Sequence, residues 1–292
     1  MQYSLSLDIL GKNLHNSRMN NDFRSYIKGI LIIFFCWFIL GSTASRLAVS
    51  LIPESYSYRL FITMNIQSLF MFIGILLSLR YVLNWDLRSF ISESRVFHHR
   101  ESLAIAFLWL ALFTVTTIIE GNLDPERILR GSDWITWMRF LPIVLLLTPI
   151  QTTAEELFFR TYLARWAQSA GMKSSLIIAL SGIIFLAVHL LNPEIALYHS
   201  DPFIYIYYAV FGSCMMGIGL FDHSFEIPII IHLMNNLFTL LIINYHGSVL
   251  TSPALFYAKD ASPLASTISI LIGSAGTCLL IRKPTDPHKT SR

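Results

Sequence analysis

Residues 141–160 read LPIVLLLTPIQTTAEELFFR, an apolar run that ends in two adjacent glutamates and an arginine. The charged residues are Glu155, Glu156 and Arg160. A charged side chain at the centre of a bilayer costs at least about 2.5–3.5 kcal/mol on insertion scales, so such residues are rare unless they are paired or functional. This stretch therefore predicts a membrane-spanning helix that carries a polar site.

The composition of the whole chain agrees with a membrane protein. Of 292 residues, 54% are hydrophobic and 13% are charged, and the mean hydropathy is +0.58; an ordinary soluble domain has about 25% charged residues. The net charge of +3 gives no support for nucleic-acid binding. The cysteines Cys36, Cys214 and Cys278 are widely separated, which predicts packing thiols rather than a disulfide framework or a metal site.

Eight apolar segments have the length and flanking charges of membrane spans. We expect them near residues 28–51, 60–83, 102–119, 140–160, 174–191, 202–221, 227–245 and 263–281. The predicted fold is all-α, a polytopic membrane protein with about eight transmembrane helices around an intramembrane polar cavity. Its predicted parts are a cytoplasmic lead (1–27), a single membrane domain (28–281, with a motif-bearing core at about 140–245) and a cytoplasmic tail (282–292).

The placement of lysine and arginine predicts the orientation of the chain. If the N-terminus is cytoplasmic, fifteen of the 21 basic residues fall on inner segments, five fall on outer loops, and Arg46 lies within the first span. Cytoplasmic loops of membrane proteins carry an excess of basic residues. The ratio predicts that both termini lie in the cytoplasm and that the number of spans is even. The expected location is a bacterial inner or plasma membrane, in which the protein is multi-pass.

The two glutamates of the first motif differ in their predicted surroundings. On an α-helix, residues four apart share a face, so Glu156 can pair with Arg160, whereas Glu155 projects about 100° away. One carboxylate is then neutralised, and the other remains free to act as a general base or acid. The alternative is a helix end that emerges into water with ordinary solvated charges.

Two further polar motifs lie in later apolar segments. Phe185 and His189 are four residues apart on the fifth segment, and His232 and Asn236 are four apart on the seventh, where Asn235 competes for the role of Asn236. Each motif alone has a structural explanation, because such side chains also hydrogen-bond across neighbouring spans. Three polar clusters on three spans are hard to explain as independent helix contacts, so we expect one shared site.

The three motifs resemble those of a known family. Glu-Glu-x-x-x-Arg (155–160), Phe-x-x-x-His (185–189) and His-x-x-x-Asn (232–236), in this order, are similar to the motifs of the CPBP family, also called Abi. That family joins type II CAAX prenyl endopeptidases to bacteriocin-processing and immunity-type membrane proteins. The resemblance covers about residues 140–245 and includes the glycine-rich stretch GIGLF (217–221). It departs from the usual pattern at Asp222-His223, where relatives often carry a small turn of Thr-Gly type.

The resemblance implies an eight-helix intramembrane protease with a water-filled cavity. Glu155 would activate a water with the help of His189, and His232 with Asn236 would stabilise the oxyanion of the tetrahedral intermediate. The implied supporting residues are Glu156, Arg160, Phe185 and Asn235. No cofactor is favoured; if the enzyme instead binds zinc, the ligands would be Glu155, His189 and His232.

The implied partners are the lipid bilayer and a membrane-embedded or lipidated substrate: a prenylated tail, a leader peptide or a C-terminal sorting signal. One alternative is a non-catalytic immunity or scaffold protein of the same fold, which would not need a free Glu155. Another is a small-solute transporter, which is expected to show repeats between its halves, and none is visible. The sequence therefore favours the enzyme.

Two further expectations concern the depth of the histidine motifs and the location of the tyrosines on the sixth segment. With the boundaries above, His189 lies about 22 Å from the cytoplasmic start of its span, and His232 lies about 8 Å from the start of its parallel span. Misplaced boundaries are the expected cause of this mismatch. Tyr205, Tyr207 and Tyr208 are expected to anchor the sixth segment at the membrane interface rather than to line a substrate channel.

Overall fold

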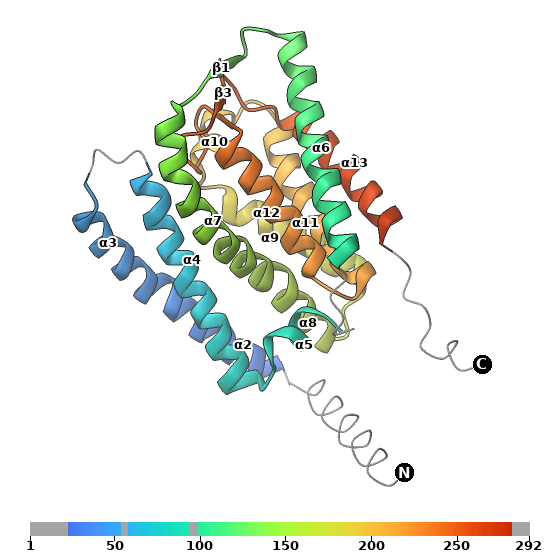
Figure 1. Cartoon of the computed structure of the whole chain (residues 1–292). Helices are drawn as coiled ribbons and strands as arrows, with labels where there is room; N and C mark the ends of the chain where they lie inside the picture. The colour runs from blue at the N-terminus through green and yellow to red at the C-terminus, as the bar shows by residue number, and fades with distance from the viewer. Residues whose placement is uncertain (1–22, 54–57, 94–98, 282–292) are drawn as a thin grey trace.

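The structure is a computed structural model that describes residues 23–53, 58–93 and 99–281, and its long helices make eight passes across one bundle (Figure 1). Three passes contain a π-helical segment: α2 (Phe23–Phe34), η1 (Phe35–Gly41) and α3 (Ser42–Leu51); α4 (Arg59–Ser78) and η2 (Leu79–Leu83); and α7 (Trp134–Glu156), η3 (Leu157–Tyr162) and α8 (Leu163–Ser169). The other five are α6 (His99–Leu123), α9 (Ser174–His189), α11 (Phe203–Asp222), α12 (Glu226–Leu241) and α13 (Pro263–Leu280).

The eight passes confirm the predicted polytopic membrane fold. Six of them are long and apolar enough to cross a membrane, and α9 and α12 are shorter, with 16 residues each. Many large apolar side chains point outward; Leu146 on α7 and Ile183 on α9, for example, are 67% and 64% exposed. Such surfaces suit lipid, whereas soluble monomers rarely expose large apolar patches. The predicted lead and tail lie largely outside the described residues, but the first helix already begins at Phe23.

The two ends of the bundle differ in what covers them (Figure 1). At one end, which we call the termini face, α2 begins and α13 ends, and α5 (Leu87–Ile91) and the turns 170–173 and 223–225 lie there. At the other end, the sheet face, lie α10 (Pro193–Leu197) and the strands β1 (Ile128–Arg130), β2 (Ile243–Tyr245) and β3 (Phe256–Ala258). The strand order is β1-β3-β2, with β1 antiparallel and β2 parallel to β3. The sequence analysis did not predict this small sheet.

Small residues bring α9 and α11 into close contact. A Cβ atom at Gly212 would lie 2.7 Å from the Cβ of Phe185, and one at Gly182 would lie 2.7 Å from the carbonyl oxygen of Ala209. The hydroxyl of Ser181 donates a hydrogen bond to the Gly212 carbonyl at 3.1 Å. Such small-residue contacts are a common way for membrane helices to pack without a hydrophobic driving force. Here they hold Phe185 against α11.

The offset between α9 and α12 brings Phe185, the first residue of its motif, level with His232. The helices begin at Ser174 and Glu226, within one residue of the predicted starts, so the expectation of misplaced boundaries is wrong. Phe225, just before α12, belongs to the same buried cluster as Ile177 in the first turn of α9, so α12 starts about one turn deeper. Phe185 is eight residues beyond Ile177 and His232 seven beyond Phe225, about 12 and 11 Å along parallel helices. Their rings accordingly lie at similar depth, with centroids 6.4 Å apart.

Candidate active site

A cavity of about 280 Å³ lies inside the bundle, and six of the eight predicted site residues line it. These are Glu155, Phe185, His189, His232, Asn235 and Asn236. Trp37 and Met71 also line the cavity. Trp37 is 14 residues from each end of the pass Phe23–Leu51, and Met71 is 12 from each end of the pass Arg59–Leu83. The cavity therefore lies at the level of the middle of these two passes.

Glu155 presents its carboxylate to the cavity. It lies at the end of α7, just before the π-helical segment η3, and its side chain is 19% exposed. Gln151, one turn earlier, donates a hydrogen bond from Nε2 to Oε1 of Glu155 at 3.2 Å. Oε2 lies 3.7 Å from Nε2 of His232, which is beyond hydrogen-bond distance. One carboxylate oxygen is thus held in place, and the other faces His232 without a direct hydrogen bond.

Glu156 and Arg160 form the predicted pair behind the cavity wall. Both side chains are fully buried, and NH1 of Arg160 lies 3.4 Å from Oε1 of Glu156. The guanidinium carbon of Arg160 lies 4.0 Å from the centre of the Phe185 ring, a cation–π contact. Within the described part of the chain, the guanidinium nitrogens of Arg160 have no hydrogen-bond partner. Glu156 and the Phe185 ring are therefore its main sources of stabilisation.

His232 joins the two glutamates, a contact that the sequence analysis did not predict. Its Nδ1 lies 2.8 Å from Oε1 of Glu156, while Nε2 faces Glu155. Because an ionised carboxylate only accepts hydrogen bonds, Nδ1 carries the proton of this bond. The Glu156–Arg160 pair thereby orients the imidazole so that Nε2 points toward the cavity.

His189 lies at the C-terminal end of α9, and its Nδ1 is 2.6 Å from the carbonyl oxygen of Phe185. A carbonyl oxygen cannot donate, so Nδ1 carries the proton, and Nε2 of the neutral ring has a free lone pair. The ring stacks on Tyr208 with centroids 4.5 Å apart. His189 is thus arranged to accept a hydrogen bond inside the cavity.

Asn236 and Asn235 lie beside each other on α12. Nδ2 of Asn235 donates a hydrogen bond to Oδ1 of Asn236 at 3.2 Å. The side chain of Asn236 is buried and lines the cavity with its acceptor occupied. Its amide N–H groups therefore remain to donate to a bound group.

A buried carboxylate that the sequence analysis missed lies next to His189. Glu194 on α10 is 1% exposed. It accepts hydrogen bonds from the Tyr208 hydroxyl at 2.6 Å, from Nδ2 of Asn192 at 3.1 Å and from the backbone N–H of Val249 at 3.0 Å. The only signal in the sequence is an acidic residue between two apolar segments, directly after Asn-Pro. Glu194 ties α10, α11 and the loop after β2 together.

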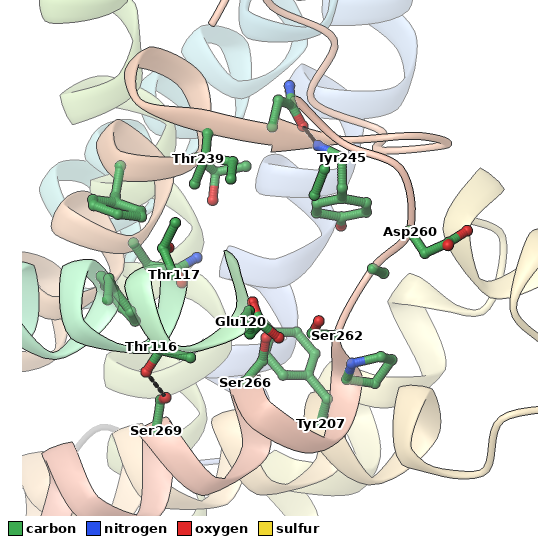
Figure 2. Close-up of a pocket in the computed structure, with 18 of the residues that line it drawn as sticks. Thr116, Thr117, Glu120, Tyr207, Thr239, Tyr245, Asp260, Ser262, Ser266 and Ser269 are labelled. Carbon is green, nitrogen blue, oxygen red and sulfur yellow. Dashed lines mark hydrogen bonds between the residues drawn. The ribbon is translucent and has the colours of Figure 1, made fainter. Parts of the chain in front are cut away.

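The expectation that the tyrosines of α11 anchor at the interface is wrong for two of them. Tyr207 and Tyr208 line the cavity. Beyond them lies a second chamber of about 140 Å³, and the two spaces share the wall residues Tyr207, Tyr208, Asn235, Thr239 and Tyr245. Figure 2 shows this chamber, with Glu120 of α6, Tyr207 of α11 and Ser266 of α13 close together. Glu120 and Asp260 give its lining an acidic character, and Thr116 and Ser269 hydrogen-bond at its edge at 2.8 Å.

The donor groups do not gather into a zinc site. Over residues 23–53, 58–93 and 99–281, no three His, Cys, Asp or Glu side chains lie together in a way that would hold a metal ion. Glu155 and His232 are neighbours, and the bond from Nδ1 of His189 to the Phe185 carbonyl leaves Nε2 as the ring nitrogen of His189 that faces the cavity. In the described part of the chain, Glu155, His189 and His232 thus do not form a preassembled set of three metal ligands.

Eight passes around a buried carboxylate–imidazole cluster define an integral membrane protein with a candidate active site inside its helix bundle. Residues 135–238 match the family described as type II CAAX prenyl endopeptidase Rce1-like, and they include all three motifs. This part of the chain is an Rce1-like domain of the CPBP family, and membership of that family implies an intramembrane protease that acts on protein or peptide.

A curated relative extends the similarity beyond that domain. The chain is 27% identical over 223 residues to the uncharacterized protein YyaK of Bacillus subtilis (strain 168), over 74% of this chain and 73% of that protein. No solved structure matches the chain.

Proposed function

We propose that the protein is an intramembrane endopeptidase that hydrolyses a peptide bond of a membrane-associated or lipidated protein or peptide, with Glu155 as the general base. The observation that carries this proposal is the approach of Glu155 on α7 to His232 on α12, 3.7 Å apart beside a cavity at the middle of the bundle. Peptide hydrolysis needs a base that activates water and donors aimed at the developing oxyanion. The cavity lining supplies both kinds of group.

In the first step, a water held by Glu155 attacks the carbonyl carbon of the scissile bond. Its oxygen forms the new C–O bond, its proton passes to the Glu155 carboxylate, and the carbonyl electron pair moves onto oxygen. The donors for this oxyanion are the amide of Asn236 and Nε2–H of a protonated His232. In the second step the C–N bond breaks, the amine nitrogen takes the proton from Glu155, and a carboxylic acid and an amine leave; the acid proton then passes to the amine through water, which gives the carboxylate and the ammonium product.

His189 assists the base. Its Nε2 lone pair accepts a hydrogen bond from the attacking water, which orients an oxygen lone pair toward the substrate. The ring orientation depends on the Phe185 carbonyl and on Tyr208, which Glu194 holds through a hydrogen bond of 2.6 Å. Glu194 and Tyr208 are therefore positioning residues in this mechanism.

The Glu156–Arg160 pair acts through His232. Glu156 accepts the hydrogen bond from Nδ1 and so keeps Nε2 directed into the cavity, while Arg160 balances the charge of the buried carboxylate. The proposed mechanism uses no metal ion; among residues 23–53, 58–93 and 99–281, no group of three His, Cys, Asp or Glu side chains is placed to hold one.

The test compares protein termini in cells that produce the wild type, Glu155→Gln or Glu126→Gln. Glu155→Gln preserves the shape of the side chain and removes the base. Glu126 is 90% exposed on the loop between α6 and β1, so its change to Gln is a matched control. We expect one or more membrane or secreted proteins to accumulate uncut only in the Glu155 variant. Unchanged termini, with the protein abundant and folded, would refute the protease and favour a non-catalytic immunity or scaffold role.

A further inference from the structure

The cavity of the candidate site extends toward the sheet face. Beyond the central cluster, its lining comes from Met64 in the first turns of α4, from Asn192 and Glu194 near α10, and from residues 248–250 after β2. All these elements lie at the sheet face (Figure 1). Among the residues that the structure describes, none from α5 or from the turns 170–173 and 223–225 lines the cavity. The cavity therefore has its mouth away from the termini face.

A wide groove continues this path to the surface. It has a volume of about 1170 Å³ and is lined by parts of α4, β1, β3 and the loop 244–251. We call it the vestibule. The vestibule and the cavity share Met64, Tyr245, Ser248 and Val249. A peptide lying in the vestibule would thus reach the cluster of Glu155 without crossing the bundle.

The charges of the chain indicate which side of the membrane the sheet face meets. Among the described residues other than the fully buried Arg160, seven basic residues lie on segments of the termini face: Arg24, Lys28, Arg80, Arg88, Arg100, Arg165 and Lys173. The sequence stretches 1–22, 94–98 and 282–292, which adjoin helix ends of that face, contain seven more. The segments of the sheet face hold five: Arg59, Arg127, Arg130, Arg139 and Lys259. The excess of basic residues marks the cytoplasmic side of a membrane protein. The sheet face is therefore the non-cytoplasmic one.

We infer that the substrate reaches the active site from the non-cytoplasmic side of the membrane, through the vestibule at the sheet face. This inference rests on the proposed function. The substrates are then segments of exported or membrane-anchored proteins that are displayed outside the cytoplasm, and cytosolic tails are excluded. Among the residues that the structure describes, the vestibule lining contains Arg130, His246 and Lys259 and no carboxylate, so it suits a neutral or acidic segment better than a basic one.

The test places single cysteines in a chain whose three native cysteines are changed to alanine. Met64→Cys reports on the junction of vestibule and cavity. Two exposed control positions mark the faces: Asn122→Cys at the end of α6 on the sheet face, and Gln168→Cys at the end of α8 on the termini face. Intact and permeabilised cells are treated with a membrane-impermeant maleimide. The same variants are repeated with Glu155→Gln, because labelling does not require turnover.

We expect the cysteines at 122 and 64 to react in intact cells and the cysteine at 168 to react only after permeabilisation. The reverse pattern would overturn the inference while leaving the protease mechanism intact. A cysteine at 64 that reacts from neither side, with the controls as expected, would also overturn it, because the vestibule would be closed. A cleavage site located in a cytosolic tail of an identified substrate would contradict it independently. Failure of the proposed function would leave the labelling pattern unchanged and would appear only as unchanged protein termini.

Discussion

The buried pair of Glu156 and Arg160 allows a quantitative test of the site architecture. Arg160→Met keeps a long apolar stem and removes the charge, which leaves the Glu156 carboxylate buried with His232 as its remaining partner. Removing one partner of a buried ion pair typically destabilises a protein by about 3–5 kcal/mol. The lost contact between the guanidinium and the Phe185 ring adds to that cost. We therefore expect the free energy of unfolding to fall by about 3–5 kcal/mol.

Two further variants show whether the loss comes from the unpaired charge. Glu93→Gln is the control: Glu93 lies 2.6 Å from Arg165, but its side chain is 46% exposed, so the expected loss is at most about 1 kcal/mol. Combining Glu156→Gln with Arg160→Met removes both buried charges. The double variant should be more stable than the sum of its single variants predicts, with a coupling energy of about 0.5–3 kcal/mol.

The measurement is the unfolding free energy of the full chain in lipid bicelles, for the parent, the single variants and the double variant. A loss below about 1 kcal/mol for Arg160→Met, equal to that of Glu93→Gln, would show that the arginine is not buried against Glu156. Strictly additive losses in the double variant would show that the two charges are not coupled. Either result would remove the structural basis for the orientation of His232.

The remaining predictions concern single positions and conditions. Asn236→Ala should slow cleavage of an identified substrate by about 10²–10³-fold, as for a lost oxyanion donor, and Asn235→Ala should slow it less. Equal effects of the two substitutions would show that Asn236 is not the specific oxyanion donor. Gly212→Ala should lower the unfolding free energy by about 1–3 kcal/mol, because its Cβ would lie 2.9 Å from a backbone oxygen of α9; an unchanged value in bicelles would contradict this packing. Asp133 caps α7, and the hydrogen bond from the Thr136 hydroxyl is the main cause of its lowered pKa. A lowered pKa means that the cap stabilises the folded state above the unfolded-state value of about 3.9 and that this stability is lost as pH falls through the folded-state value. Asp133→Ala should therefore lower the melting temperature at pH 7, and a gap from wild type that persists under strong acid would refute the capping role. Cleavage should survive removal of zinc by a chelator, and its loss, with recovery on zinc addition, would favour the metalloprotease alternative.

The number and the limits of the membrane passes followed from local sequence. The observed starts of α9 and α12 agree with the prediction within one residue, because the change from polar to apolar residues in the sequence marks where each span begins. The fourth pass, Trp134–Ser169, is longer at both ends than expected, since polar helix turns outside hydrocarbon leave no hydropathy signal. The sheet was not predicted because each strand has only three residues, too few for an alternating pattern.

The candidate site was predictable where its contacts are local. The Glu156–Arg160 pair is an i, i+4 contact and was expected from helix geometry. The contact of His232 with Glu156 joins residues 76 positions apart, and no local pattern encodes it. Tyr208 was wrongly predicted to lie at the membrane interface, because aromatic residues near the ends of apolar segments are typical interfacial anchors. Its true environment depends on α10, which folds Glu194 back over the cavity.

The sequence by itself determined the class of this protein, its eight passes and the residue types available for chemistry. A span in hydrocarbon needs a long apolar run, and a charged residue within such a run is costly, so both features can be recognised in the sequence without a structure. Tertiary structure alone decided which glutamate holds His232, how α9 and α12 are offset, and at which face the cavity opens. These features depend on how far one helix is shifted along its neighbour. That shift comes from close packing of small and large side chains between helices, which leaves no trace in the length or hydropathy of any single segment.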